Sequence, residues 1–371
     1  MIVIRHSMDC CGCSACIDVC PHHCITQITD TDGYIKPSVD ANQCVDCHQC
    51  EKVCPELNTL HLPFERRKLY SAYHKDDNIR SQGSSGSVFA ALAQYVFSRN
   101  GVVFGAAFDD QMKLLHIKAE NMEELRPLMR SKYLQSNTMG IFNAIKQELK
   151  QGKLVLFVGT PCQTNAVYNY INPALKKYLL LVDFICHGVP SQQFFDKSIH
   201  YLEKREKVKI LKVSFRTKHN GLYHSYEIQY TDKDGNIATK KGPYTEFPFY
   251  RAFKSYITFR DSCYHCKHTG EERVSDLTIG DFWGIRSLSS DISNEDFAKG
   301  YSEVVVNTSL GGAILEQMHE YLILKQVDIK YAGYSNPSYL KCVKAGKRKL
   351  LFRFLNRYFP YSITEKVLFR N

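Results

Sequence analysis

The chain has 371 residues, 44% of them hydrophobic, which is enough apolar sequence to fill the cores of two or three domains and too much for a disordered chain. Its formal net charge is +10, but residues 341–371 hold nine Lys/Arg and one Glu, so this tail carries +8 and the other 340 residues only +2. The charge therefore does not indicate a nucleic-acid-binding surface, and the longest apolar runs, Leu154–Val158 and Leu179–Val182, are far shorter than the roughly 20 residues of a membrane span.

Two cysteine runs near the N-terminus dominate the sequence. Residues 10–21 and 44–55 share the pattern C-x2-C-x2-C-x3-C-P, and the copies start 34 residues apart. This pattern is typical of ferredoxins with two 4Fe-4S clusters, in which the fourth cysteine of each run ligates the other cluster. We therefore predict one cluster on Cys10, Cys13, Cys16 and Cys54, and a second on Cys44, Cys47, Cys50 and Cys20.

Structural zinc and disulfides are the alternatives for these cysteines. Zinc sites usually pair two C-x2-C units, and Met1–Ser7 lacks the apolar stretch of a signal peptide, so we expect a cytoplasmic protein with reduced thiols. Cys11 and Cys24 fall outside the pattern, and we expect both to be ordinary packing residues. Asp32–Pro37 predicts a hairpin with an Asp-Gly turn, which completes an α+β, ferredoxin-like two-cluster domain over residues 1–62.

After a polar, proline-containing stretch at residues 60–68, predicted strands and helices alternate. Strands are expected at 69–74, 101–108, 114–119, 153–158, 179–186, 277–284 and 304–306, with antiparallel strands within 211–242. Helices are expected near 88–98, 122–129, 138–150, 246–257 and 313–322. The pattern predicts an α/β domain with a mixed sheet, in an N-terminal part (68–152) and a C-terminal part (153–325), followed by a basic helical tail (326–371).

Four further cysteines occupy suggestive positions in this second domain. Cys162 and Cys186 each follow an apolar strand, and Cys263 and Cys266 form a C-x2-C pair. Ligands gather at the carboxyl ends of strands in α/β sheets. The residues alone leave three interpretations open, which are a third four-thiolate cluster, a zinc site and unrelated core or surface cysteines.

Two polar segments are candidates for binding a phosphate-bearing ligand. Ser81–Ser87 lies between a strand and a helix, where glycines allow close backbone approach and a helix N-terminus attracts anions, although a flexible connector has the same composition. Arg130–Asn137 offers two cations with hydroxyl and amide donors, which is also the composition of a solvated turn.

These motifs together resemble a known family, the beta subunits of coenzyme F420 hydrogenases and dehydrogenases, which includes 7-hydroxymethyl chlorophyll a reductase. The resemblance extends from residue 10 to about residue 325 and rests on the cysteine runs, Ser-Gln-Gly-Ser-Ser-Gly, Arg-Ser-Lys-Tyr-Leu-Gln-Ser, Gly-Thr-Pro-Cys-Gln, Cys-His-Gly-Val-Pro-Ser and Ser-Asp-Leu-Thr-Ile-Gly-Asp-Phe-Trp-Gly, all in the family's order. This chain differs from the small hydrogenase subunits in its fused ferredoxin domain and basic tail. Coenzyme F420 is therefore not the expected substrate, and fused members resemble bacterial enzymes of surface-polysaccharide loci.

The resemblance implies a flavin-binding domain in which FAD lies beside a third 4Fe-4S cluster. The implied cluster ligands are Cys162, Cys186, Cys263 and Cys266. The implied FAD contacts are Ser81, Gly83, Ser84, Gly86, Ser87, Lys132, Tyr133, Ser136, Asn137, Thr160 and Gln163. His187, beside a cluster ligand, and Asp281, at a strand end, are candidate catalytic groups, for which buried structural roles are the alternative.

We therefore expect an iron-sulfur flavoprotein oxidoreductase. Electrons would enter from ferredoxin or another one-electron donor, cross the clusters and reach FAD, which can deliver two electrons to a small-molecule substrate. The alternative is a non-catalytic electron-transfer subunit of a larger hydrogenase or dehydrogenase complex.

The tail predicts an amphipathic helix over residues 347–359. Its apolar face comprises Leu351, Phe352, Phe354, Leu355, Tyr358 and Phe359, and its basic face comprises Lys349, Arg353 and Arg357. Such a helix suits peripheral contact with the inner, anionic face of a membrane. Docking of the helix on its own domain or on a partner protein is the alternative.

Overall fold

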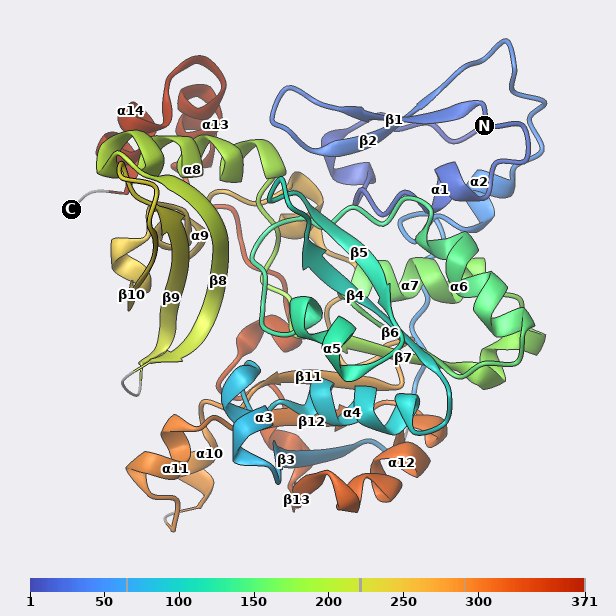
Figure 1. The fold of residues 1–371 in the computed structure, drawn as a ribbon. Helices are drawn as coiled ribbons and strands as arrows, with labels where there is room; N and C mark the ends of the chain where they lie inside the picture. Colours follow the sequence, from blue (N-terminus) through green and yellow to red (C-terminus); the bar gives the residue numbers. More distant parts are fainter. Residues whose placement is uncertain (65, 220–221, 290, 370–371) are drawn as a thin grey trace.

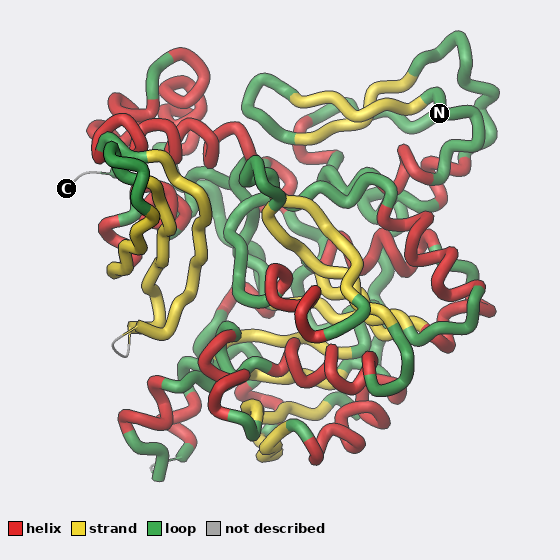
Figure 2. The backbone as a smooth tube through the Cα atoms, viewed as in Figure 1, coloured by secondary structure: helices red, strands yellow, loops and turns green. Residues whose placement is uncertain are grey.

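The computed structural model describes residues 1–64, 66–219, 222–289 and 291–369. Figure 1 shows a central sheet flanked by helices, with the N-terminal region above it on one side and a smaller sheet with the C-terminal helices on the other. Loops rather than helices or strands connect these regions where they meet (Figure 2). Glu65 of the predicted boundary, residues 220–221 of the predicted antiparallel region and residues 370–371 of the predicted tail lie outside the described residues.

The N-terminal region is a hairpin with two short helices. It contains β1 (Ile25–Thr29), β2 (Ile35–Val39), α1 (Ala15–Asp18) and α2 (Gln49–Lys52). At the hairpin turn, Asp30 Oδ1 accepts hydrogen bonds from the backbone N–H groups of Asp32 at 3.0 Å and Tyr34 at 2.9 Å, and Gly33 has a φ of +83°. That left-handed conformation favours glycine, so the Asp-Gly sequence specifies the turn, and the predicted hairpin is confirmed.

Eight strands form the central mixed sheet. In spatial order they are β13 (Leu322–Val327), β3 (Lys68–His74), β12 (Ser302–Val306), β11 (Leu277–Asp281), β7 (Leu179–Phe184), β6 (Val155–Gly159), β4 (Val102–Phe108) and β5 (Leu114–Ala119). The pairs β4–β6, β6–β7 and β7–β11 are parallel, and the outer pairs are antiparallel. The mixed sheet is as predicted, and the two parts on either side of residue 152 share it.

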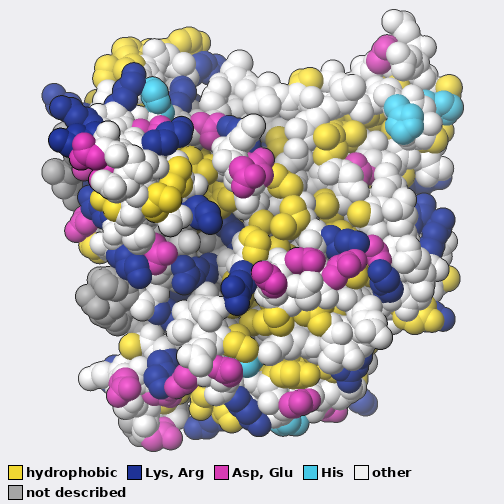
Figure 3. All heavy atoms as spheres, viewed as in Figure 1, with side chains coloured by type: hydrophobic (Ala, Val, Ile, Leu, Met, Phe, Trp, Pro, Cys, Tyr) yellow, Lys and Arg dark blue, Asp and Glu magenta, His cyan; other side chains and the backbone are white. Residues whose placement is uncertain are grey.

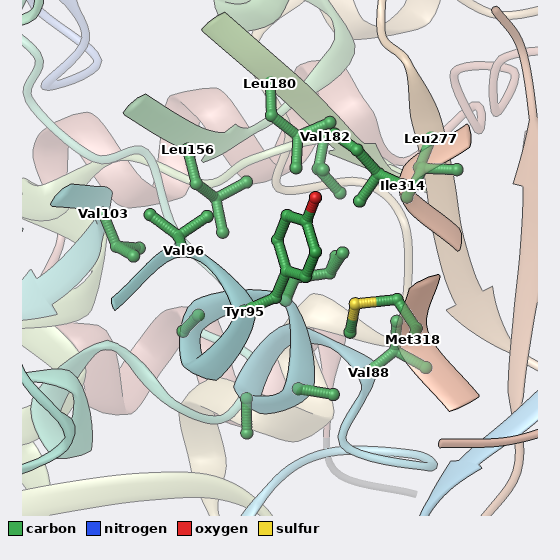
Figure 4. Packing of buried hydrophobic residues seen from close by; sticks show 14 of the residues in the cluster. Val88, Tyr95, Val96, Val103, Leu156, Leu180, Val182, Leu277, Ile314 and Met318 are labelled. Carbon is green, nitrogen blue, oxygen red and sulfur yellow. The ribbon is translucent and has the colours of Figure 1, made fainter. Parts of the chain in front are cut away.

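Helices cover both faces of this sheet. They are α3 (Asp77–Gln82), α4 (Val88–Phe97), α5 (Met122–Leu125), α6 (Ile141–Lys150), α7 (Pro161–Tyr170) and α12 (Ser309–Glu316), and α10 (Ile285–Leu288) and α11 (Asn294–Ala298) extend from one end. In β7, Leu180 and Val182 point to the α4 side, where Figure 4 shows them around Tyr95 and Val96. Leu179 and Leu181 point to the opposite side. Burial on both faces explains why these strands are continuous apolar runs.

The predicted helix over residues 313–322 is partly wrong. Helix α12 begins earlier, at Ser309, after Thr308 Oγ1 caps it by accepting the backbone N–H of Gly311 at 3.1 Å. From Leu322 onward the chain is strand β13, paired antiparallel with β3 from Leu322↔His74. Pairing with the sheet edge therefore overrides the local helical pattern.

A second, three-stranded sheet and the C-terminal helices form the remaining region. The sheet has the order β10 (Ile237–Pro243), β9 (Leu222–Thr231), β8 (Lys209–His219), and the helices are α8 (Gln192–Glu206), α9 (Pro248–Phe253), α13 (Lys349–Tyr358) and α14 (Tyr361–Leu368). The ring of Phe352 in α13 meets that of Phe194 in α8 edge-on at 5.1 Å. The tail helix therefore docks on its own chain. No helix within the described residues combines the length and apolar character needed to cross a bilayer.

Candidate iron-sulfur and flavin site

Two cavities lie inside the N-terminal region, and each is lined by one predicted set of four ligands. The first, with an empty volume of about 370 Å³, is lined by Cys10, Cys13, Cys16 and Cys54. The second, of about 330 Å³, is lined by Cys20, Cys44, Cys47 and Cys50. Each set takes three cysteines from one run and one from the other, as the spacing predicts. Within the described residues no three His, Cys, Asp or Glu side chains converge as they would on a single metal ion.

The thiols of the first cavity are buried and crowded. Burial, followed by the neighbouring Cys13 thiolate, raises the pKa of Cys16 and raises that of Cys54 to about 12. Without iron these groups are therefore protonated at neutral pH. Cluster binding must displace those protons, so it couples the folding of this region to metal.

The four further cysteines come from three separate segments and are close enough for their charges to affect one another's pKa values. Cys162 is in the first turn of α7, after β6, whereas Cys186 follows β7, and Cys263 and Cys266 are at a short 3-10 helix, Asp261–His265. Burial is the main cause that raises the pKa of Cys266, and the thiolate charges of Cys162, Cys263 and Cys186 add to it. The parallel order β6–β7 brings the first two together at one sheet edge.

Cys11 and Cys24, expected to be packing residues, are buried but also contact the candidate ligands. Cys11 packs with Cys13 and Cys162, and these neighbouring thiols raise the pKa of Cys11 well above its usual value, whereas Cys11 lowers that of Cys162 to about 6. Cys24 Sγ lies 3.4 Å from Cys20 Sγ. Cys11 therefore lies between the first cavity and the Cys162 group.

Arg260 joins the N-terminal region to the rest of the chain. Its buried guanidinium donates from Nε to the Cys10 carbonyl at 2.7 Å, from Nη2 to the Ile35 carbonyl at 2.8 Å and from Nη1 to Gln135 Oε1 at 3.0 Å. Gln135 Nε2 in turn donates to the Cys11 carbonyl at 3.0 Å. The Arg130–Asn137 segment, expected to contact FAD, thus also contacts the first cysteine run.

The predicted FAD contacts divide into two groups, the first of which surrounds Ser81–Ser87, where α3 ends and a short loop leads to α4. Ser84 Oγ accepts the backbone N–H of Ser131 at 3.0 Å, which holds the loop beside the Arg130 segment. A Cβ on Gly86 would lie 2.2 Å from the Ala72 carbonyl oxygen, so only glycine fits there. The other members form local contacts: Ser81 Oγ donates to Asn78 O, Ser87 Oγ to Arg80 O and Lys132 Nζ to Met129 O, and Gly83 is buried next to Ser84.

The second group lies near the Cys162 thiol. Gln163 Nε2 donates to Ser136 Oγ at 3.0 Å, and Thr160 Oγ1 is 3.1 Å from Cys162 Sγ. Asn137 bridges to Leu115 in β5. Tyr133 packs away from this group, with its ring stacked on Phe253 at 4.3 Å.

The two candidate catalytic groups lie at the ends of adjacent parallel strands. Asp281, at the end of β11, accepts two hydrogen bonds of 2.6 Å from Arg216, and although burial would raise its pKa, Arg216 lowers it. Burial, followed by Lys254, lowers the pKa of His187 to about 4, and its ring stacks on Tyr256 at 6.0 Å. Arg216 therefore favours the ionised form of Asp281, and burial favours the neutral form of His187.

The cavity beside Asp281 combines residues of the quoted motifs, such as Ser85 and Trp283, with Arg216 and Lys218, which belong to no motif that would have selected them. This cavity, with an empty volume of about 330 Å³, is lined by Ser85, Arg216, Lys218, Asp281, Phe282, Trp283, Phe297, Gly300 and Tyr301. Burial, followed by the charges of Arg80 and Arg216, lowers the pKa of Lys218 to about 7. The one available signal for Arg216 was the alternation of inward and outward side chains along β8, which is interrupted at Arg216 by a β-bulge.

Comparison with known proteins agrees with these features. The family model for the C terminus of the coenzyme F420 hydrogenase/dehydrogenase beta subunit matches residues 152–330, and the 4Fe-4S dicluster domain matches residues 9–57. Residues 152–330 belong to the coenzyme F420 hydrogenase/dehydrogenase beta-subunit family. The motif-based resemblance is therefore confirmed, and the N-terminal domain of this family member binds 4Fe-4S clusters.

Two individual proteins are similar to parts of this beta-subunit family member. A ferredoxin from Hydrogenibacillus schlegelii, named Ferredoxin 7Fe, is 38% identical over 65 residues, which are 17% of this chain and 77% of the ferredoxin. A chain in the F420-reducing nickel-iron hydrogenase complex from Methanosarcina barkeri is 17% identical, with a TM-score of 0.45, over 81% of this chain and 90% of that chain.

Proposed function

We propose that this protein is an iron-sulfur flavoprotein oxidoreductase that passes electrons from a one-electron donor, through its clusters, to FAD and a two-electron substrate. The observation that carries the proposal is the position of Cys11, between Cys13 of the first cavity and Cys162 of the third thiol group. This order forms a continuous path from the N-terminal domain to the edge of the central sheet.

A third 4Fe-4S cluster fits the donor set at that edge. Cys162, Cys186, Cys263 and Cys266 are four thiols, and the effect of their charges on one another's pKa values supports a common site. Thiolates of this kind are the usual ligands of 4Fe-4S clusters.

FAD fits the region between the Ser81–Ser87 loop and the third thiol group. The segment ends at the N-terminus of α4, where backbone N–H groups favour an anion such as the pyrophosphate. The residues proposed to hold it are Ser81, Gly83, Ser84, Gly86, Ser87, Lys132, Tyr133, Ser136, Asn137, Thr160 and Gln163. When bound, FAD would supply the exchange between one-electron and two-electron transfer.

Electrons enter at the second cavity in this proposal. Cys47 is exposed and Cys44 partly exposed, whereas all four ligands of the first cavity are buried. Val45, beside them, is 61% exposed and provides an apolar contact for a donor such as ferredoxin. The order of exposure therefore places the second cavity outermost on the path.

The first prediction is that the anaerobically purified protein contains FAD and that reduced ferredoxin reduces it. The reason is the continuous path of thiol groups described above. Stopped-flow absorbance should show the visible bands of the clusters bleach before those of the flavin. A Val45→Glu variant should slow the ferredoxin reaction without affecting reduction by dithionite, and a colourless protein with stoichiometric zinc would contradict the proposal.

The second candidate function is that of an electron-transfer subunit in a larger complex, which the family's description as a beta subunit favours. A subunit of this kind would relay electrons without reducing a substrate by itself. The two functions are distinguished by testing whether the isolated chain turns over sugar-linked substrates of surface-polysaccharide synthesis. Turnover supports the oxidoreductase, and its absence supports the electron-transfer subunit. The comparisons name no partner for this chain.

We also propose that the C-terminal helices contact an anionic membrane at the cytoplasmic face. Lys349 and Arg353 bind Asp261, and Arg353 and Arg357 bind Asp32, so the predicted basic face is turned inward. The outward side instead exposes large apolar residues, and Figure 3 shows apolar and cationic side chains together over α13 and α14, at upper left. The exposed apolar residues are Leu350, Leu351, Phe354, Tyr358, Phe359, Ile363 and Val367.

The charges around this apolar surface suit anionic lipid. Lys341, Lys344, Lys347, Arg348, Arg357 and Lys366 are exposed. The one acidic residue among residues 341–371, Glu365, is buried and bound to Arg251. Exposed cations without exposed acids, mixed with aromatic and aliphatic residues, are typical of peripheral membrane attachment.

The corresponding prediction is that replacing Leu350, Phe354 and Tyr358 together with serine abolishes sedimentation with anionic liposomes. These three exposed side chains contribute the apolar contact area and are not themselves partners in the ion pairs with Asp32 and Asp261, so the fold should persist. Ile237→Ser removes a side chain that is 66% exposed on β10 and serves as the matched control. Sedimentation of the triple variant at the wild-type level would exclude the helices as the attachment site.

A further inference from the structure

Strand β8 contains an irregularity that places a charged side chain in the cavity beside Asp281. Phe215 pairs with Tyr226 and Thr217 with Ser225, so Arg216 is the extra residue of a β-bulge. Its φ is +58°, a left-handed conformation that is uncommon for residues other than glycine. Bulges redirect side chains and are frequent next to functional sites. Here the bulge directs the guanidinium toward the end of β11.

The hydrogen-bonding capacity of Arg216 is only partly used. The side chain is 5% exposed, and both Nη atoms donate to Asp281. The Nε atom is buried and has no hydrogen-bond partner among the described residues. A buried, unused donor of a charged group is unfavourable, so its retention points to a group that is bound during function.

Lys218, two residues further along β8, lines the same cavity. Its Nζ donates to the Ser85 carbonyl oxygen at 2.6 Å and to that of Arg80. An ammonium group has three N–H donors, and the described residues supply no acceptor for the third. Arg216, Lys218 and Asp281 are the charged residues that line the cavity, which leaves an excess of one positive charge.

We propose that this cavity binds the anionic group of the substrate, a carboxylate or a phosphate, with Lys218 as its principal ligand. The inference rests on the proposed oxidoreductase function, because it names the substrate class of that site. An anion here would neutralise the excess positive charge and accept the unused donors. The buried rings of Phe282 and Tyr301 and the partly buried ring of Trp283 reduce access of water, which strengthens the ion pairing.

The location of the cavity agrees with this role. Asp281 ends β11, whose neighbour β7 leads directly into Cys186 and His187. The proposed anion site and the third thiol group therefore lie at the same edge of the sheet. A substrate anchored at Lys218 would be held next to the end of the electron path.

Anion binding should be coupled to proton uptake. Burial lowers the pKa of Lys218 to about 7, Arg80, Arg216 and Arg130 act in the same direction, and Asp281 opposes them. An anion beside the ammonium raises this pKa, because it stabilises the charged form. Affinity should therefore be highest below about pH 7 and decrease as the pH rises through the pKa of the bound state.

The test is isothermal titration calorimetry of the cluster-containing protein with inorganic pyrophosphate and with malonate, without an electron donor. At pH 7.5 we expect binding whose heat depends on the ionisation enthalpy of the buffer, as proton uptake requires. Lys218→Met should weaken binding by about tenfold or more. Lys218→Arg should keep the binding and lose the proton uptake, because guanidinium stays charged at this pH. Lys212→Met, at an exposed position of the same strand, is the matched control.

Three results would overturn the proposal. They are absence of binding by both anions, unchanged binding in Lys218→Met, and proton uptake that persists in Lys218→Arg. If Lys218→Met does not fold, the Lys218→Arg measurement still decides. Titrating FAD-loaded and FAD-free protein separates the two sources of an anion, since loss of binding on FAD loading would assign the cations to the flavin pyrophosphate and refute a substrate site. The two proposals can also fail separately. If the protein binds the anion with proton uptake but ferredoxin does not reduce its flavin, only the oxidoreductase function is refuted.

Discussion

Replacing Cys263 and Cys266 together with serine is expected to remove about four of about twelve irons per chain. The two side chains supply half of the proposed third ligand set, so the remaining Cys162 and Cys186 could not hold a cluster. Loss of a residue that only supports a metal ligand typically reduces metal affinity or activity by roughly 10- to 100-fold. Because this variant loses two direct ligands, reduction of the flavin by ferredoxin should slow by more than that. Iron analysis and stopped-flow absorbance measure the two effects.

Cys342→Ser provides the matched control for this experiment. Cys342 is partly buried, and its thiol donates to the carbonyl oxygen of Tyr264 at 3.4 Å; Tyr264 directly follows Cys263 in the sequence. Cys342 itself belongs to no proposed ligand set. This variant should keep the full iron content and the full rate. About eight irons in both wild type and double variant would show that the third group holds no cluster. An unchanged rate of flavin reduction by ferredoxin in the double variant would show that these cysteines are not on the electron-transfer path.

Arg260→Met is expected to loosen the N-terminal domain from the rest of the chain. The substitution leaves the Cys10 carbonyl, the Ile35 carbonyl and Gln135 Oε1 without their donor. An unsatisfied buried acceptor costs about 1–3 kcal/mol, so the total loss of unfolding free energy should exceed about 3 kcal/mol. Anaerobic urea unfolding measures this loss, and electron transfer to the flavin should slow with it, because Cys11 would shift relative to Cys162.

The control for Arg260 is Arg286→Met, which removes an exposed arginine bound to Asn294 Oδ1. Surface substitutions of this kind change stability by less than about 0.5 kcal/mol. Equal urea midpoints for the two variants would show that Arg260 does not hold the domains together.

The cysteine sites could be predicted because their chemistry is encoded in local spacing. The two runs specified which cysteines share a cavity, and the Asp-Gly pair specified the hairpin between them. Apolar strands buried on both faces likewise predicted the central sheet. Sheet edges were harder, because β13 is an exposed strand whose pairing with β3 is set by tertiary contacts rather than by its own pattern.

The charged groups around Asp281 and the first cysteine run could not be predicted for a different reason. Arg216 reaches Asp281 through a bulge, and Arg260 joins three distant segments, so neither has a neighbour in sequence that marks its role. The tail shows the same limit. Its amphipathic pattern was clear, but Asp32 and Asp261 were needed to show that the basic side faces inward.

The ion pairs between α13 and Asp32 have a consequence for how the protein matures. Arg353 and Arg357 leave the ribosome more than 300 residues after the hairpin turn that they bind. During that interval the cysteine runs are already synthesised, but the ion pairs with α13 have not formed. The hydrogen bonds of Arg260 and Gln135 to the backbone at Cys10 and Cys11 have not formed either. Iron and sulfide therefore have the most open route to the first cavity before the last helices are synthesised. The order of synthesis favours insertion of the clusters before the C-terminal helices dock.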